Sequence, residues 1–253
     1  MRLPFEFPKP LILCHRGAKN YAPENTLAAF KIALELGADG FELDTQLTSD
    51  GHVVVFHDVT MDLTTNGHGK LSNLPLAELR ELEAGGSFVG KFRGEKIPTL
   101  DEVFESFGKR AIINVELKNF SMPFDSLVEK VCEVVHRHGM QKNIIFSSFL
   151  PWNLKKAARL LPEVPRALIT MRGRWGVWGR SFGFNFGDYD ALHPNLVDVT
   201  AQQVQRVHKL NRKINVWTVN AEEDMRRLIG WGVDGFITDD PLLAVRVAKG
   251  TPA

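Results

Sequence analysis

Several short apolar runs in the sequence end in side chains that could move protons or hold ions. These side chains are His15 and Arg16 after the first run, Glu42 and Asp44 after the second, His57 and Asp58 after the third, and Glu116 and Lys118 after the fourth. Because side chains two residues apart on a strand share a face, Glu42 and Asp44 point the same way. The same spacing aligns Glu116 with Lys118.

Three of these residues, Glu42, Asp44 and Glu116, are carboxylates that would converge. Without a cation they would repel one another, and at least one pKa would rise. Oxygen ligands suit a hard ion, Mg²⁺ or Ca²⁺, and do not suit zinc, but they do not choose between those two ions. A single Glu-x-Asp pair is common on solvated strands. The recurrence of such pairs inside apolar runs favours a metal site, because buried charges need partners.

His15 and His57 are candidates for acid–base catalysis, because imidazole titrates near neutral pH. Either one alone could be a hydrogen-bonded core histidine. Their shared position at strand ends, beside the carboxylates, favours the catalytic interpretation.

Arg16 and Lys118 supply local positive charge of the kind that binds phosphate groups. They could also form salt bridges to Glu42 or Glu116, and both interpretations can hold in an empty site.

Two further residues could line the same site. Trp217 lies in the apolar run 214–219. If it points inward it would be a flat wall for a carbon backbone, and if it points outward it would pack between strand and helix. His193 ends a short predicted strand, and its position is the argument for including it.

Segments typical of strands and helices alternate along the chain. The strand-like runs are 11–14, 41–47, 53–56, 111–117, 144–146, 167–169, 191–193, 214–219 and 236–238. Helical spacing of apolar residues, or a helix-start signal, marks segments at 27–36, from 99, 124–137, 152–161, 200–210, 220–229 and from 241. This alternation predicts a parallel sheet, and about eight βα units favour a closed (β/α)8 TIM barrel. Active sites of that fold lie at the carboxyl ends of the strands, where the polar residues fall.

Residues 58–98 break the alternation and include a turn-rich stretch at 64–69. We interpret them as a small inserted subdomain after the second strand of a single domain, 1–253. Three helices carry capping signals at their starts, namely Thr99 with Glu102, Thr200 with Gln203, and Asn220 with Glu223.

Residues 171–190 contain six aromatic residues in twenty, whereas the whole chain is 9% aromatic. Five glycines are interleaved with them. This composition indicates a flexible aromatic loop at the barrel mouth. The loop could bind an apolar leaving group, cover the site, contact a lysolipid or membrane surface weakly, or fold over a small core of its own.

The composition excludes some partners. The 31 basic and 30 acidic residues give a formal net charge of +1, so there is no bulk basic field to hold nucleic acid. The first eight residues lack the apolar run of a signal peptide, and no stretch approaches the ~18 apolar residues of a membrane span. We therefore expect a cytoplasmic protein with a small-molecule substrate. The oligomeric state is not indicated.

The polar motifs together resemble the signature blocks of the glycerophosphodiester phosphodiesterase family, in order and from about residue 11 to 245. The blocks are His15-Arg16-Gly17, Pro23-Glu24-Asn25-Thr26, Glu42-Leu43-Asp44, His57-Asp58, Thr64-Thr65-Asn66-Gly67, Ile97-Pro98-Thr99-Leu100, Glu116-Leu117-Lys118, Trp217-Thr218-Val219-Asn220 and Thr238-Asp239-Asp240-Pro241. The resemblance implies a TIM barrel that cleaves glycerophosphodiesters to glycerol 3-phosphate and an alcohol.

The resemblance also implies roles for individual residues. It implies that Glu42, Asp44 and Glu116 are metal ligands, that His15 and His57 are the catalytic pair, and that Arg16 and Lys118 contact the phosphate. The segment 171–190 belongs to no shared block. Two alternatives stay open: an enzyme that releases a cyclic phosphate or acts on lysophospholipids, and a catalytically silent barrel that binds glycerophosphodiesters.

Overall fold

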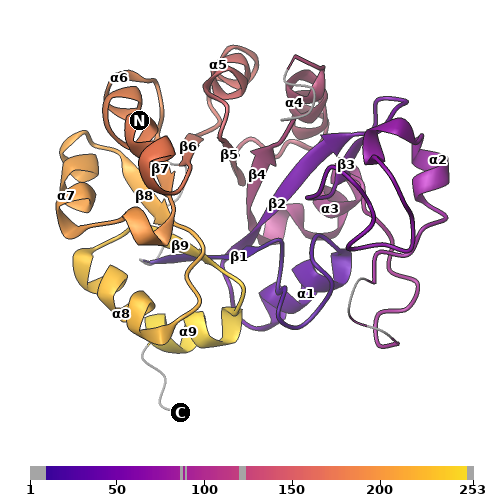
Figure 1. Ribbon diagram of the computed structural model, residues 1–253, viewed down its shortest axis with the longest axis horizontal. Coiled ribbons are helices and arrows are strands. Elements are labelled where there is room, and N and C mark those ends of the chain that lie inside the picture. Colours follow the sequence, from indigo (N-terminus) through magenta and orange to yellow (C-terminus); the bar gives the residue numbers. More distant parts are fainter. Residues whose placement is uncertain (1–9, 86–87, 89, 120–123, 250–253) are drawn as a thin grey trace.

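Eight parallel strands form a closed barrel in the computed structural model, which describes residues 10–85, 88, 90–119 and 124–249 (Figure 1). The strands are β1 (Leu11–His15), β2 (Gly40–Leu47), β4 (Ile112–Leu117), β5 (Ile144–Ser148), β6 (Arg166–Thr170), β7 (Ala191–Pro194), β8 (Lys213–Val216) and β9 (Gly235–Thr238). Neighbours in this order pair in parallel, and β1 closes the ring by pairing with both β2 and β9. The predicted TIM barrel is confirmed.

Helices surround the barrel (Figure 1). The longer ones are α1 (Leu27–Glu35), α3 (Leu100–Phe107), α4 (Leu127–His138), α5 (Pro151–Leu160), α7 (Ala201–Lys209), α8 (Glu222–Trp231) and α9 (Pro241–Lys249). The predicted caps Thr99 and Thr200 accept backbone N–H bonds at the starts of α3 and α7, and Thr99 forms a reciprocal capping box with Glu102. These bonds satisfy N–H groups that a helix start leaves unpaired. Within the described ranges, no helix has both the length and the apolar character to cross a membrane.

The helix predicted from Asn220 begins later, and its predicted cap is wrong. Ala221 occupies the cap position of α8 without a side-chain hydrogen bond. The Asn220 side chain bonds Asp239 instead: its Nδ2 donates to Oδ2 at 2.7 Å, and its Oδ1 accepts from the backbone N–H at 2.9 Å. The end of β9 therefore offers this amide both a donor and an acceptor. The preceding strand is also shorter than predicted, because β8 ends at Val216.

Residues 58–98 interrupt the βα alternation after the second strand, as their turn-rich sequence predicts. The strand β3 (Val53–Val55) pairs antiparallel to β2 and leads into them. This region includes the short helix α2 (Leu76–Leu79) and packs around an apolar cluster of its own. The buried members of that cluster are Val54, Phe56, Met61, Leu71, Leu79, Ala84 and Ile97.

Apolar side chains fill the barrel interior below the polar residues. Leu13 of β1 and Ile112 of β4 belong to one inner cluster. Because faces alternate along a strand, His15 continues the inward face of Leu13. Glu116, four residues after Ile112, also points inward. β1 and β4 thus pack the floor with their first residues and present a polar side chain near their carboxyl ends.

The aromatic segment, predicted as a flexible loop, forms short helical turns at 173–176 and 179–183 followed by α6 (Phe184–Phe186). Its glycines give it low intrinsic helix propensity, so sequence reasoning missed these turns. Tertiary contacts hold them: Arg180 donates to the carbonyls of Met171 and Gly173 at 2.7 and 3.0 Å, and Phe184 is fully buried.

Candidate active site

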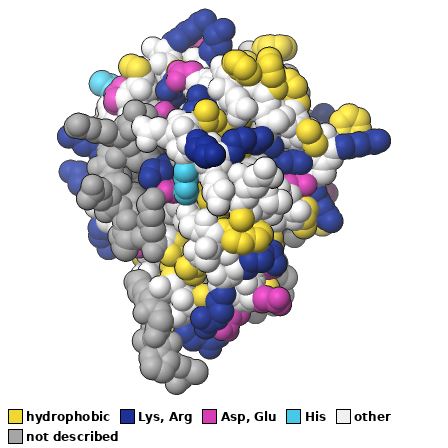
Figure 2. Space-filling view, turned by 90° about the vertical axis from the view of Figure 1, so that its left-hand side faces the viewer, with side chains coloured by type: hydrophobic (Ala, Val, Ile, Leu, Met, Phe, Trp, Pro, Cys, Tyr) yellow, Lys and Arg dark blue, Asp and Glu magenta, His cyan; other side chains and the backbone are white. Residues whose placement is uncertain are grey.

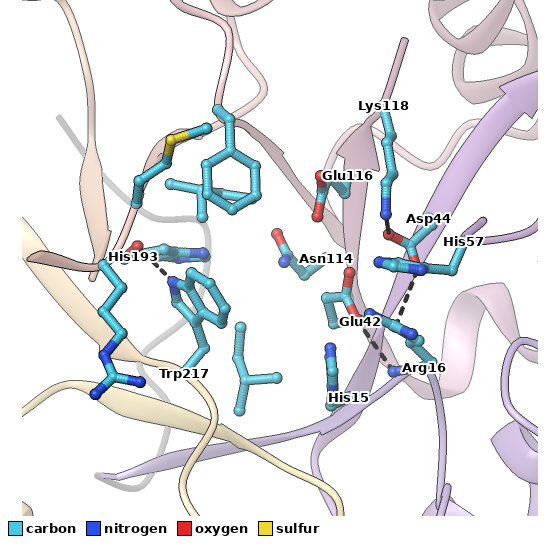
Figure 3. A pocket seen from close by; sticks show the side chains of 15 residues that line it. His15, Arg16, Glu42, Asp44, His57, Asn114, Glu116, Lys118, His193 and Trp217 are labelled. Atoms are coloured by element: carbon cyan, nitrogen blue, oxygen red, sulfur yellow. Dashed lines mark hydrogen bonds and ion pairs between the residues drawn. The ribbon is translucent and has the colours of Figure 1, made fainter. Parts of the chain in front are cut away.

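A pocket of about 350 Å³ opens at the carboxyl ends of the strands. The nine residues that the sequence analysis placed in a candidate site all line it, namely His15, Arg16, Glu42, Asp44, His57, Glu116, Lys118, His193 and Trp217, whereas Asp58 does not. Asn114, Phe149, Ile169, Met171, Arg172 and Ile237 complete the lining. Figure 3 shows Glu42, Asp44, Glu116, Arg16 and Lys118 on one side of the pocket, with Trp217 and His193 on the other. The pocket therefore has a charged wall and a largely apolar wall.

The charged wall is built around three carboxylates. Asp44 of β2 and Glu116 of β4 are partners in the parallel register, and Glu42 lies two residues before Asp44. Each of the three offers an oxygen, and these oxygens lie within 4.8 Å of one another. All three side chains are buried, and Oε1 of Glu116 has no hydrogen-bond partner in the described structure. This donor set fits a hard divalent cation.

The crowding of these acids changes their protonation. Burial, together with the charges of Asp44 and Glu116, raises the pKa of Glu42 well above its usual value. Burial and the Asp44 charge raise the pKa of Glu116 to about 8. Although burial opposes it, the charges of Lys118 and Arg16 lower the pKa of Asp44 below its usual range. The metal-free pocket therefore favours the protonated forms of Glu42 and Glu116, whereas a bound cation would favour their ionised forms.

Arg16 and Lys118 both pair with Asp44. The Arg16 Nε lies 3.3 Å from Oδ2 of Asp44, and the Lys118 Nζ lies 3.2 Å from its Oδ1 (Figure 3). Arg16 contacts Glu42 through its backbone N–H, which donates to Oε2 at 3.1 Å. Both basic residues thus pair with Asp44, and Arg16 pairs with Glu24 as well, rather than with Glu42 or Glu116 as the sequence suggested.

A tight turn after β1 directs Arg16 toward the acids. Arg16 has a φ of 56° and Gly17 a φ of 84°. A Cβ on Gly17 would lie 2.7 Å from the Cβ of Ala29 in α1, so only glycine fits there. The guanidinium is further held by Glu24, whose Oε1 accepts from Nη1 at 2.8 Å. Packing of the turn against α1 therefore fixes where this positive charge lies.

Each of the two predicted catalytic histidines has a carboxylate at its Nδ1. His15 Nδ1 lies 2.8 Å from Oδ1 of Asp239, and His57 Nδ1 lies 2.6 Å from Oδ1 of Asp58. An ionised carboxylate only accepts, so each neutral ring carries its proton on Nδ1 and leaves Nε2 as a base. Burial lowers the pKa of both rings, against the opposing effect of nearby acids. Neutral rings of this kind can take up a proton, and their protonated forms can deliver one.

Three polar residues at the site were not assigned roles from the sequence. Asp239 holds His15, Asn25 donates to Oδ2 of Asp44 at 3.0 Å, and Asn114 lines the pocket with both amide atoms unpaired in the described structure. A signal existed for two of them. Asp239 follows an apolar strand, and Asn114 shares the face of Glu116 by its spacing of two residues.

Trp217 and His193 form part of the opposite wall. Trp217 follows β8, points into the pocket and donates from Nε1 to the backbone carbonyl of His193 at 2.8 Å (Figure 3). Trp217 therefore points inward, which is one of the two orientations that the sequence left open. The Nε2 of His193 lies 3.0 Å from the amide nitrogen of Asn215 and accepts from it. Burial lowers the pKa of His193 to about 3, so this ring is neutral at physiological pH.

Comparison with known proteins gives relatives over nearly the whole chain. The model of the glycerophosphoryl diester phosphodiesterase family matches residues 15–243. A glycerophosphodiester phosphodiesterase of Caldanaerobacter subterraneus subsp. tengcongensis is 40% identical over 242 residues, covering 95% of this chain and 98% of that protein. A solved structure of an Oleispira antarctica phosphodiesterase in complex with the product sn-glycerol-3-phosphate is 32% identical, with a TM-score of 0.84, and the match covers 96% of this chain and 97% of that one.

The closed parallel barrel, with its polar cluster at the strand ends, defines an enzyme of the TIM-barrel class. The chain belongs to the glycerophosphoryl diester phosphodiesterase family. The resemblance seen in the sequence motifs is thereby confirmed.

Proposed function

We propose that this chain hydrolyses glycerophosphodiesters to glycerol 3-phosphate and an alcohol. The observation that carries the proposal is the convergence of an acidic triad and two carboxylate-bonded histidines in one pocket. The names of the relatives support the same substrate class, and the product bound to the Oleispira protein is one that this reaction would release.

Glu42, Asp44 and Glu116 are the proposed ligands of one divalent cation, Mg²⁺ or Ca²⁺. Their oxygens are close enough to share an ion, and no nitrogen or sulfur ligand takes part. When bound, such an ion polarises the phosphodiester and lowers the pKa of an oxygen that it contacts. Asp44 has a lowered pKa and Glu42 and Glu116 have raised ones, so ion binding would compete with protons at the two glutamates.

The basic residues are proposed to bind the phosphoryl group. Arg16 and Lys118 lie at the edge of the acidic cluster through their contacts with Asp44. There they stabilise the charge that grows on the phosphoryl oxygens. On the opposite wall, the ring face of Trp217 is proposed to contact the carbon skeleton of the substrate. The neutral ring of His193 is proposed to contact it from the same side.

His15 and His57 are proposed to exchange the protons. One ring takes the proton of the glycerol 2-hydroxyl as its oxygen forms a bond to phosphorus. The other ring, protonated, gives its proton to the leaving alcohol as the phosphorus–oxygen bond breaks. Water then opens the cyclic phosphate with the proton transfers reversed. Since both rings have a carboxylate at Nδ1, their contacts do not assign the acid and the base.

A turnover assay tests the proposal directly. Protein stripped with EDTA is incubated with sn-glycero-3-phosphocholine, and glycerol 3-phosphate and choline are measured after adding Mg²⁺ or Ca²⁺. We expect activity only with an ion, loss of activity in Glu116→Gln, and retention in Glu133→Gln, which changes an exposed carboxylate. No product with either ion would overturn the activity. Unchanged turnover in EDTA would overturn the metal assignment.

A second candidate is an enzyme that acts on lysophospholipids or stops at the cyclic phosphate. The apolar wall formed by Phe149, Ile169 and Met171 favours a substrate with a hydrocarbon chain. Phosphorus NMR of the products separates a cyclic phosphate from a monoester, and a lysophosphatidylcholine assay tests the chain-bearing substrate. A silent binding barrel would bind glycerol 3-phosphate without turnover, and the intact histidine–carboxylate pairs argue against it.

We also propose that residues 1–253 act as one domain, with 58–98 as an insertion on the barrel, and that the protein works in the cytoplasm. The pairing of β1 with β9 supports the single domain, because the barrel needs strands from both ends of the described chain. Limited proteolysis tests this arrangement: cleavage within 58–98 should leave two fragments that stay associated.

A further inference from the structure

Six Phe and Trp side chains are exposed in the part of the chain that the structure describes. They are Phe124, Trp152, Trp175, Trp178, Phe182 and Phe186, which we call the aromatic rim. All of them lie on the segments that follow β4, β5 and β6, three strands that are neighbours in the barrel. Trp175 and Trp178 follow closely after Met171 and Arg172, which line the pocket, so this part of the rim lies at the pocket mouth. Phe182 and Phe186, with ring centroids 4.5 Å apart, extend the rim toward the other end of the barrel, where Arg212 donates to the Gly187 carbonyl.

Contacts with other side chains and with the backbone hold the segments that carry the exposed rings. In the segment after β6, the buried Arg180 bonds two backbone carbonyls and lies 3.1 Å from Asp198, and Phe184 packs in the core. In the segment after β4, Phe124 stacks on Trp152 of α5 with ring centroids 6.4 Å apart. The structure therefore anchors the segment after β6 through buried side chains and leaves the rim exposed.

Positive charge lies beside Trp175 and Trp178, whereas the exposed acid Asp188 lies beyond Phe186. Residues 171–187 contain Arg172, Arg174 and Arg180 and no acidic residue. With Arg180 buried, the exposed charges are Arg172 and Arg174, and the Arg174 guanidinium lies 5.3 Å from the ring centroid of Trp175. Figure 2 shows hydrophobic side chains gathered toward the upper right of this face, with Lys and Arg side chains close by.

We propose that the aromatic rim binds the surface of anionic phospholipid membranes. Exposed Trp and Phe beside arginine is the combination that enters the headgroup region, where the rings leave water and guanidinium groups meet lipid phosphates. The chain as a whole has almost no net charge, so attachment depends on this local patch. Met171 and Arg172 line the pocket and begin the same segment, so the docked protein opens its pocket toward the membrane.

Co-sedimentation with vesicles tests the proposal without relying on turnover. The vesicles contain either phosphatidylcholine alone or phosphatidylcholine and phosphatidylglycerol in equal parts. We expect wild type to pellet with the mixed vesicles, and Trp175→Ser/Phe186→Ser to lower the partition coefficient at least about tenfold. These two side chains are 76% and 77% exposed, so their loss should leave the fold intact. Arg174→Glu should weaken binding to the mixed vesicles more than to phosphatidylcholine alone.

Leu160→Ser is the matched control, because Leu160 is an exposed apolar residue at the far end of α5. It should bind vesicles as wild type does. Equal melting temperatures and equal turnover of soluble sn-glycero-3-phosphocholine show that the rim variant is folded. Wild type that stays in the supernatant, or a rim variant that pellets fully, overturns the proposal. The proposal is also overturned if wild type is a dimer that binds no vesicles and that the rim substitutions dissociate. The rim would then bind a second copy of the chain.

Discussion

The Nδ1 atom of His15 lies 2.8 Å from Oδ1 of Asp239, and this contact joins the first strand of the barrel to the last one described. Although burial opposes it, the hydrogen bond to His15 lowers the pKa of Asp239 to about 2. The carboxylate is therefore ionised under all conditions in which the enzyme would work. It keeps the imidazole in the tautomer whose Nε2 can accept a proton.

We predict that Asp239→Asn lowers kcat at least about 10²-fold with a smaller change in KM, because an amide can donate to Nδ1 and favour the wrong tautomer. Loss of the carboxylate should also shift to lower pH the limb of the pH–rate profile that reports His15, since Asp239 raises the pKa of His15. Steady-state kinetics from pH 5 to 9 check both effects. Asp188→Asn, at an exposed carboxylate, is the control. A wild-type kcat in Asp239→Asn would remove this residue from a positioning role.

We predict that His15→Ala and His57→Ala each lower kcat at least about 10²-fold with a choline leaving group. An activated leaving group such as p-nitrophenol needs no proton. The variant that lacks the general acid should therefore recover most of its loss on that substrate, and the variant that lacks the base should not. Full activity of His15→Ala on both substrates would contradict the two-histidine mechanism.

We predict that Glu116→Gln stabilises the metal-free protein at pH 8. The folded state holds the Glu116 proton up to a pKa of about 8, against an ordinary value of 4.5, so wild type loses stability as pH rises through this window. Glutamine avoids that loss, and we expect a gain of about 4 kcal/mol at pH 8 and little change at pH 4.5. Urea unfolding in EDTA measures the difference. Added Mg²⁺ or Ca²⁺ should stabilise wild type and not the variant, and the opposite pattern would exclude Glu116 as a ligand.

We predict that His193→Gln reduces the acid sensitivity of the fold. The pKa of His193 is lowered to about 3, so the folded state needs the neutral ring and loses stability as pH falls below the ordinary value of 6.5. Wild type should lose about 1.4 kcal/mol per pH unit more than the variant between pH 6 and 4. Urea unfolding at several pH values checks this slope. The exposed His52→Gln should match wild type, and parallel curves for wild type and His193→Gln would contradict a buried neutral ring.

The barrel could be predicted because each βα unit carries a local signal. Strand runs, helical spacing and the Thr99 cap depend on residues that are close in sequence. The errors arise where a distant contact overrides the local pattern. Asn220 leaves the helix cap because Asp239 binds its amide. The turns at 173–183 are held by Asp198, which accepts from the Gly173 N–H at 2.9 Å and pairs with Arg180 at 3.1 Å. Neither partner can be read from the local sequence.

The same reasoning explains what could be predicted of the site. Alternation of strand faces placed Glu42 and Asp44 on one side of β2, and the structure has them in the pocket. The pairing of Arg16 with Asp44 depends on the turn at Gly17, which no periodicity describes. Asp239 was missed as a partner of His15 because 224 residues separate them.

The pairing of β1 with β9 also has a consequence for biosynthesis. During translation, His15 leaves the ribosome long before Asp239 does, and the two can meet only after nearly all of the described chain has emerged. Until then β1 exposes an unpaired edge, which makes the nascent chain a target for chaperones. Acid–base competence therefore arises at the moment the ring of strands closes, so the first appearance of turnover during cell-free synthesis would report the final step of folding.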